Sequence, residues 1–178
     1  MTSPPPLAQA VVGFPASDAW WQAQVYNPLS FLYKPPLFVG YQASAQSIPN
    51  SSFTSMNIDT EIVDSVGGHS TSSNPSRYTF QVAGWYRLDG MTVFATNTTG
   101  IRGTKFLKNG TTQVIGSETV ITATTGFQST TRASAYVQAA VGDYVELQGY
   151  QNSGNNLSTS AAGSFEYVTS MSIKWVST

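Results

Sequence analysis

The chain has 178 residues, of which 40% are hydrophobic and only 10% charged, and its formal net charge is −1. That length predicts one domain with its own core, and the eight Lys and Arg residues are too scattered to form a nucleic-acid-binding surface. The absence of cysteine excludes disulfides, thiol chemistry and cysteine-ligated metal sites, and we expect no cofactor.

The composition predicts a surface that is polar but weakly charged. Ser, Thr, Asn, Gln and Gly replace the charged residues that make up about a quarter of an ordinary protein. Such a surface repels its neighbours weakly, which suits ordered packing against copies of itself or other proteins. No apolar run is long enough to insert into a membrane, and we do not expect "MTSPPPLAQAVVGFP" to be a signal peptide.

The segment before Pro35 and Pro36 is predicted to contain a short helix. Ser17 or Asp18 is a suitable N-cap, and apolar residues follow at helical spacing. Pro28 is expected to end or kink the helix at the preceding residue. We interpret residues 1–36 as an N-terminal anchoring segment whose large apolar side chains pack either on the main domain or on another subunit. The anchor candidates are Trp20, Trp21, Val25, Leu29, Phe31, Leu32 and Tyr33.

From Leu37 onward the sequence predicts β-strands separated by turns. Tyr78, Phe80 and Val82 alternate with polar residues, as in a half-buried strand. Asn109-Gly110 is a strong hairpin signal, because both turn residues must accept a positive φ. Eight to ten such strands with regular turn spacing predict an all-β sandwich or barrel over residues 37–178.

Several motifs occur in an order that is typical of one β-fold family. They are Phe80 before a bend at Gly84 and Tyr86, the hairpin Lys108-Asn109-Gly110, the turn Gly142-Asp143, and an aromatic closing strand with Phe165 and Tyr167. Together they resemble the C1q/TNF-like jelly roll over about residues 37 to 178. The resemblance implies a jelly-roll sandwich preceded by the short helical, Pro-flanked anchor. It also implies that three subunits pack around a common axis.

The whole chain is also similar to small proteins of tailed actinobacteriophages. The similarity covers the Pro-rich start, the segment "NPLSFLYKPP", the stretch "HSTSSN" and the jelly-roll motifs. Such proteins are usually described as minor tail or other virion surface proteins. The resemblance implies a virion component assembled in the host cytoplasm, with other phage structural proteins as partners of the N-terminal segment. It leaves a tail position and a capsid decoration equally open.

Many predicted strands carry apolar or aromatic residues on both sides. The pairs are Trp85–Tyr86, Tyr136–Val137, Tyr144–Val145, Tyr167–Val168 and Trp175–Val176. One face of a sandwich strand fills the core, so two-sided strands imply that an outer face is also covered. A homotrimer would bury on the order of 2,000 Å² there. We take Tyr136, Tyr167 and Trp175 as the candidates for the interface between subunits, although exposed tyrosines on a polar surface are the simpler alternative.

Candidate catalytic and metal-binding groups are few. His69, the single histidine, lies in the Ser-rich stretch "GGHSTSSNPS", which is predicted to be a loop rather than a catalytic pocket. We therefore expect no catalytic residue and no enzymatic activity. Asp59, Glu61 and Asp64 are the clustered carboxylates. A solvated edge strand explains them more simply than a calcium site, which needs six to eight oxygens converging from loops.

Two functional hypotheses follow from these observations. The first is a structural virion protein, with a trimeric knob projecting from the particle and residues 1–36 attaching it. The second is a binding module that recognises a host-surface receptor or glycan. Residues 64–76 and 152–163 form the long polar loops that would make such contacts, and inert covering loops are the alternative.

Overall fold

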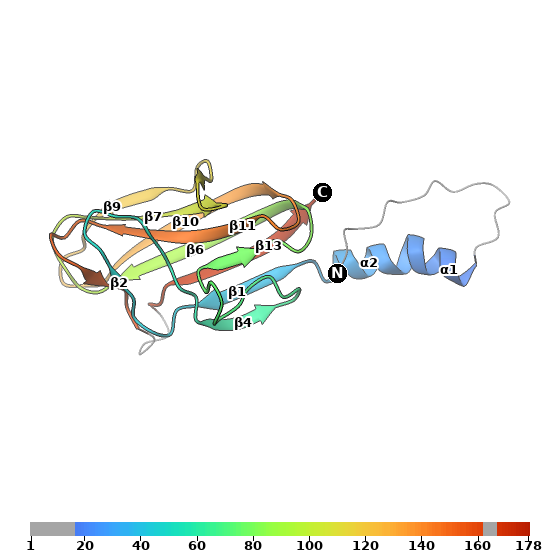
Figure 1. Cartoon of the computed structure of the whole chain (residues 1–178), viewed down its shortest axis with the longest axis horizontal. Coiled ribbons are helices and arrows are strands. Elements are labelled where there is room, and N and C mark those ends of the chain that lie inside the picture. Colours follow the sequence, from blue (N-terminus) through green and yellow to red (C-terminus); the bar gives the residue numbers. More distant parts are fainter. Residues whose placement is uncertain (1–16, 162–166) are drawn as a thin grey trace.

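The structure is a computed structural model that describes residues 17–161 and 167–178. It consists of two β-sheets packed face to face, with a helix projecting from one end (Figure 1). The strands are β1 (Leu37–Tyr41), β2 (Ser47–Ile48), β3 (Thr54–Ser55), β4 (Thr60–Asp64), β5 (Arg77–Thr79), β6 (Gly84–Phe94), β7 (Ile101–Lys108), β8 (Thr112–Gln113), β9 (Thr119–Thr122), β10 (Ser129–Ala139), β11 (Tyr144–Gln151), β12 (Leu157–Ser158) and β13 (Ser170–Ser177). Among these described residues, no helix is long and apolar enough to cross a membrane.

The projecting helix consists of α1 (Asp18–Trp21), a π-helical segment η1 (Gln22–Tyr26) and α2 (Asn27–Tyr33). Its predicted N-cap is confirmed, because the Ser17 hydroxyl accepts a hydrogen bond from the Trp20 backbone N–H at 3.3 Å. Of the two outcomes expected at Pro28, an end of the helix is wrong, because the helix continues to Tyr33, and the departure from a regular α-helix is the π-helical segment before Pro28. Pro28 has no N–H for the ordinary helical bond, and the wider π-turn directly before it accommodates its ring while the helix continues.

The long strands divide between two antiparallel sheets. The five-stranded sheet has the order β10-β6-β13-β1-β4, and the second sheet has the order β3-β11-β7-β8, with β5 on β11 and β9 on β7. The first and last long strands pair directly, with Phe38 opposite Ile173. The predicted hairpin joins β7 to β8 and is confirmed, since Asn109 and Gly110 both have positive φ, 52° and 70°.

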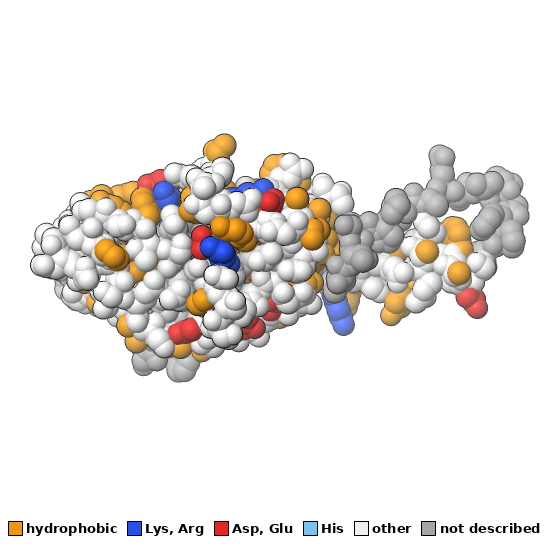
Figure 2. Space-filling view, viewed as in Figure 1, with side chains coloured by type: hydrophobic (Ala, Val, Ile, Leu, Met, Phe, Trp, Pro, Cys, Tyr) orange, Lys and Arg blue, Asp and Glu red, His pale blue; other side chains and the backbone are white. Residues whose placement is uncertain are grey.

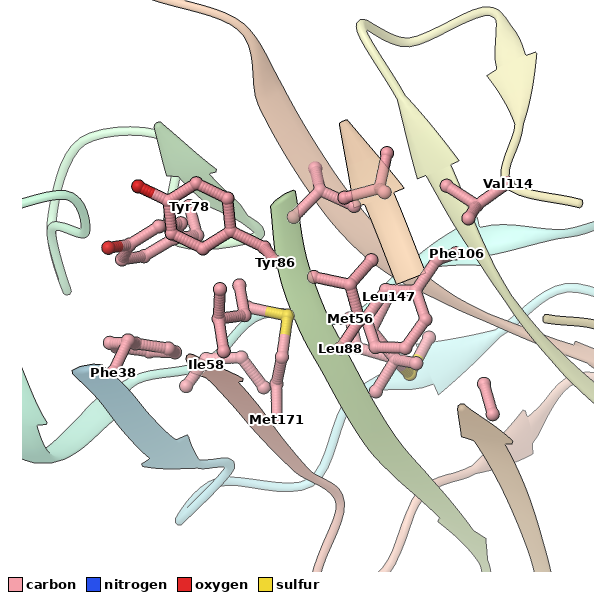
Figure 3. Packing of buried hydrophobic residues seen from close by; sticks show 14 of the residues in the cluster. Phe38, Met56, Ile58, Tyr78, Tyr86, Leu88, Phe106, Val114, Leu147 and Met171 are labelled. Carbon is pink, nitrogen blue, oxygen red and sulfur yellow. The ribbon is translucent and has the colours of Figure 1, made fainter. Parts of the chain in front are cut away.

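The core lies between the two sheets and is built mainly from aromatic and long aliphatic side chains (Figure 3). The expected alternation is confirmed for Tyr78, Phe80 and Val82, which are all fully buried. Each such side chain contributes about 1.5–3 kcal/mol through the area it removes from water. Gly90 allows the sheets to approach closely, because a Cβ atom there would lie 2.5 Å from Leu147. The core residues labelled in Figure 3 are Phe38, Met56, Ile58, Tyr78, Tyr86, Leu88, Phe106, Val114, Leu147 and Met171.

Candidate functional site

The outer face of the five-stranded sheet carries a mixture of apolar and charged side chains. We define this outer face by the side chains that alternate with the core residues along β1, β6, β10 and β13. It comprises Leu37, Val39, Trp85, Arg87, Asp89, Met91, Arg132, Ser134, Tyr136, Gln138, Ser172, Lys174 and Val176. Trp85 and Tyr136 expose large apolar areas to solvent. An aromatic side chain in such a position offers contact area together with a polar group for a partner or water.

Tyr136 lies at the centre of a charged cluster on the outer face. The Arg87 guanidinium carbon is 5.4 Å from the Tyr136 ring centroid, and Arg87 also donates two hydrogen bonds of 2.9 and 3.0 Å to the Asp89 carboxylate. The hydrogen bonds to Asp89, followed by that to the Tyr136 hydroxyl, raise the pKa of Arg87. This contact keeps the ring of Tyr136 in a fixed place on the sheet, where its side chain remains 56% exposed.

The other two interface candidates occupy different environments. Tyr167 is exposed just before β13 begins. Trp175 is only 6% exposed and points into the core, where its Nε1 donates to the Ala83 carbonyl at 3.3 Å. Its place in the core removes Trp175 from the candidates for the outer face. The next residue, Val176, points outward instead, because successive side chains of a strand point to opposite faces of the sheet.

The anchor candidates separate into one buried residue and a set of exposed ones. Phe31 is 4% exposed and packs edge-on against Trp175, with the ring centroids 4.7 Å apart. Phe31 therefore holds the helix to the sandwich of its own chain and is not available to a partner. Trp20 is half-buried and contacts the ring of Trp21 at a centroid distance of 5.8 Å.

The remaining candidates form an apolar stripe along the projecting helix. Leu29, Leu32 and Tyr33 are exposed, Tyr33 to 83%, and Val25 is half-buried. Trp21, Val25, Leu29 and Tyr33 also line an open hollow of about 540 Å³ along the helix. Apolar side chains at this spacing normally face a partner surface. In the space-filling view the same helix carries clustered apolar atoms, whereas charged groups on the sandwich are sparse and scattered (Figure 2).

His69 is held in a way that leaves neither ring nitrogen for chemistry. Its side chain is fully buried, with Nδ1 2.8 Å from the Glu61 carboxylate and Nε2 3.0 Å from the Pro75 carbonyl. Its ring packs on Phe38 at a centroid distance of 4.8 Å. A general base needs a free nitrogen within reach of a substrate proton. His69 instead fixes the loop in which it lies.

The clustered carboxylates are each engaged by the protein itself. Asp59 accepts backbone N–H bonds of 2.6 and 2.9 Å from residues 43–44. Burial raises the pKa of Asp59, but these hydrogen bonds outweigh that effect and lower it overall. Glu61 bonds to His69, and Asp64 accepts three backbone N–H groups of the turn that follows it. The three carboxylates thus serve separate structural contacts around the edge strand β4, and no metal-binding group of three such side chains occurs among the described residues.

Comparison with solved structures assigns the architecture. Murine APRIL, in its crystal structure at pH 5.0, is 11% identical, with a TM-score of 0.58 over 78% of this chain and 98% of that chain. The globular domain of zebrafish complement 1qA is 10% identical, with a TM-score of 0.55 over 79% of this chain and 96% of that chain. Eiger TNF from S. frugiperda is 7% identical, with a TM-score of 0.56 over 80% of this chain and 92% of that chain. The chain has the C1q/TNF-like jelly-roll fold. No protein-family model and no curated protein sequence matches it.

A polar hollow at one edge of the jelly roll was only partly predictable. This hollow, which we call the loop pocket, has a volume of about 300 Å³. Residues 67–70 and 73–74 form one wall, and they belong to a loop that the sequence singled out. Arg77 and Thr79 of β5, Gln81, and Tyr144 of β11 form the rest. Their contribution depends on the pairing of β5 with β11, which no local pattern indicates.

The second polar loop, residues 152–163, is partly described. Gln151 closes its first turn by accepting from the Ser153 N–H at 2.7 Å and donating to the Asn155 carbonyl at 2.8 Å. The last two residues of the loop, and Phe165 of the closing-strand motif, lie outside the described residues, as does the Pro-rich start up to residue 16.

Arg102 is a buried cation that sequence reasoning missed. Its side chain is fully buried at the start of β7, and the guanidinium donates to four oxygens at 2.9–3.2 Å. Two of them are backbone carbonyls of the turn before β7, the third is the carbonyl of Ile101 at the start of β7, and the fourth is the Asn97 side chain. Burial lowers the pKa of Arg102. The alternation of β7 would have indicated an inward position, but not the set of carbonyls that makes it possible.

Proposed function

We propose that the chain is a non-enzymatic structural protein of a tailed-phage virion. In this proposal three copies form a surface knob, and residues 1–36 attach it to the tail, the tail tip or the capsid. The observation that carries the proposal is the exposed apolar stripe with Leu29 and Leu32 on a helix that projects from the jelly roll (Figure 1). A helix with such a stripe is stable in water only when another surface covers it.

The outer face supports assembly into a trimer. Trp85 and Tyr136 stand exposed on the same face, and Met91 and Val39 lie partly exposed along neighbouring strands. Apolar side chains exposed together on one face of a sheet are suited to the closed cyclic packing that the jelly-roll resemblance implies. The sparse surface charge favours the same arrangement, because copies brought together would repel each other weakly.

A non-enzymatic role agrees with the contacts of His69. Both of its ring nitrogens are occupied, so it cannot activate a neighbouring serine or threonine hydroxyl. The assignment to a phage particle draws on the sequence similarity of the segment "NPLSFLYKPP" and the stretch "HSTSSN" to virion surface proteins of actinobacteriophages.

The attachment can be tested with a double variant of the exposed stripe. Leu29→Gln together with Leu32→Gln keeps helix propensity nearly constant and leaves Phe31 on Trp175. We expect the variant to fold and to keep the oligomeric mass of the unmodified protein, but to be missing from purified virions. Asn27→Gln, at an exposed position of the same helix that does not line the hollow, serves as the control and should incorporate normally. Normal incorporation of the double variant would show that the stripe is not the anchor.

A second candidate function is recognition of a host-surface glycan by the knob. The loop pocket favours it, because the pocket gathers hydroxyl, amide and guanidinium groups in one concave place. Attachment through the helix and recognition through the pocket use separate parts of the molecule, so both functions can coexist in one knob.

A further inference from the structure

We infer that the loop pocket binds a neutral saccharide. Its wall consists of polar side chains, with the glycines of residues 67–68 and the Tyr144 ring completing it. Aliphatic side chains, which would line a site for an apolar ligand, are missing from this wall among the described residues. The side chains that carry the argument are Ser70, Ser73, Asn74, Arg77, Thr79 and Gln81.

The loop that forms the pocket is held by hydrogen bonds to β4 and to its own chain neighbours. His69 fixes it by bonds to Glu61 and to the Pro75 carbonyl, and its own backbone N–H donates to Asp64 at 2.8 Å. The Gly68 carbonyl accepts from the Thr79 N–H at 2.7 Å. This preorganisation matters because ordering a polar loop at the moment of binding would subtract from the affinity.

Gly68 shows how closely the loop is fitted to the jelly roll. It is buried, and a Cβ atom at this position would lie 2.5 Å from the Tyr78 ring and 2.7 Å from the Thr79 carbonyl. The Ser70 hydroxyl accepts from the Ser73 N–H at 3.1 Å and so fixes the next turn. The loop adds little to the apolar core, so the many bonds that fix it serve to hold the pocket wall in one shape.

Several polar groups of the wall are left without a partner. Among the described residues, the Ser73 hydroxyl, the Asn74 side-chain amide and the Thr79 hydroxyl form no hydrogen bond within the protein. Asn74 has a positive φ of 52°, a turn conformation that Asn adopts more readily than most residues. Hydroxyls can both donate and accept, and an amide offers both functions side by side. A polyhydroxylated ligand matches such a set.

The charge of the pocket is balanced, which selects a neutral ligand. Arg77 is the cation of the wall, and its Nε lies 3.4 Å from the carboxylate of Glu146. Its guanidinium carbon is 4.3 Å from the centroid of the Tyr144 ring, a cation–π contact within the pocket wall. Glu146, which is largely buried and also accepts from Ser76 at 2.8 Å, offsets the charge of Arg77 and so weakens its attraction for an anionic ligand.

The test uses the full chain labelled with ¹⁵N and titrated with simple sugars. Glucose, galactose, mannose, arabinose and N-acetylglucosamine are each added at millimolar concentration, and amide shifts are followed. We expect at least one sugar to shift the resonances of residues 67–81 in a saturable way. Glucuronic acid, as the charged counterpart of glucose, should bind no more tightly than glucose. If no sugar of the panel shifts these amides, or if the acid binds more tightly, the inference is overturned.

Two conservative variants and a control locate the binding. Ser73→Ala and Thr79→Val remove one free hydroxyl each, and combining them should weaken binding at least tenfold. Thr71→Val changes the same loop outside the pocket wall and should bind as the unmodified protein does. Unchanged binding by the double variant contradicts the assignment. All pocket residues come from one chain, so a failed sugar titration leaves the trimer and the anchor untouched, and a monomeric protein leaves the pocket untouched.

Discussion

Phe31 and Trp175 meet edge to face, 144 residues apart in the sequence, and this contact joins the projecting helix to the jelly roll. Phe31→Ala should remove about 3 kcal/mol from the free energy of unfolding, since it empties a buried aromatic position. Leu32→Ala, at the next residue, which belongs to the exposed stripe, should cost about 0.5 kcal/mol or less. Urea unfolding of the three proteins measures the difference, and equal losses would mean that the ring contact does not hold the helix.

Assembly through the outer face can be tested at Tyr136. Tyr136→Lys places a cation beside Arg87 and Lys174, which lie in the same row of the sheet. In a trimer closed over this face, an unpaired buried charge would cost several kcal/mol. We expect the mass in solution to fall from three times 19.1 kDa to that of one chain. Ile115→Lys, at a position 94% exposed on the turn after β8, should leave the mass unchanged. A monomeric unmodified protein would refute the trimer.

Asp143 should contribute to the fall in the free energy of unfolding at acidic pH. The hydrogen bond from Lys108, followed by those from the Asn109 side chain and the Ala140 N–H, lowers the pKa of Asp143 to about 2. Because the folded pKa lies below the unfolded value near 3.8, the stabilisation is complete above about pH 4 and is lost as the pH falls towards 2. The group is near the surface, so the loss should not exceed about 1 kcal/mol.

The matched variant for this pH effect is Asp143→Asn. It should be less stable than the unmodified protein at neutral pH, and the gap should close between pH 4 and pH 2. Free energies of unfolding measured across that range decide the matter. A gap that stays constant as the pH falls would mean that the carboxylate makes no charge-dependent contribution.

Two buried tyrosines should respond in opposite ways to loss of the hydroxyl. The Tyr86 hydroxyl donates to the Val82 carbonyl at 2.7 Å, and burial raises the pKa of Tyr86 to about 12. The Tyr78 hydroxyl is buried without a partner among the described residues. Tyr86→Phe should cost about 1 kcal/mol, whereas Tyr78→Phe should be neutral or stabilise by up to about 1 kcal/mol. Thermal unfolding compares them directly, and a larger loss at Tyr78 would contradict the assignment of partners.

Arg102 should tolerate no substitution that shortens its reach. Lysine cannot present the forked donors that satisfy the carbonyls around the turn before β7. Arg102→Lys should therefore cost about 3 kcal/mol, a loss that includes carbonyls left buried without a donor. Arg132→Lys, on the exposed side of β10, provides the control and should change the stability by less than about 0.5 kcal/mol. Similar stabilities of the two variants would show that the carbonyl set is not essential.

Local chemistry explains which features could be predicted from the sequence. The Asn109-Gly110 turn requires positive φ at both residues, and few residues meet that requirement, so the hairpin follows from two letters. The alternation of Tyr78, Phe80 and Val82 likewise reflects a single buried face. In both cases the relevant forces act between close neighbours in the chain.

Features set by distant contacts could not be predicted. The alternation of Met171, Ile173 and Trp175 with polar residues indicates one buried side of β13, but the contact of Trp175 with Phe31 joins residues that are 144 positions apart. The helix passes Pro28 because a π-turn absorbs the ring, which no spacing rule indicates. The loop around His69 was predictable, whereas the contact with Glu61 that fixes it depends on how the loop folds back over β4.

The pairing of β1 with β13 determines how the protein can be labelled. Leu37 lies opposite Lys174, and the Trp175 N–H donates to the Pro36 carbonyl at 3.0 Å, so the two ends of the sandwich emerge together beside the helix (Figure 1). A fluorescent protein fused after Thr178 would crowd the helix that we propose as the point of attachment. The exposed turn around Gly154, at the opposite end, would instead carry an inserted epitope outward, where an antibody could reach it on an intact assembly.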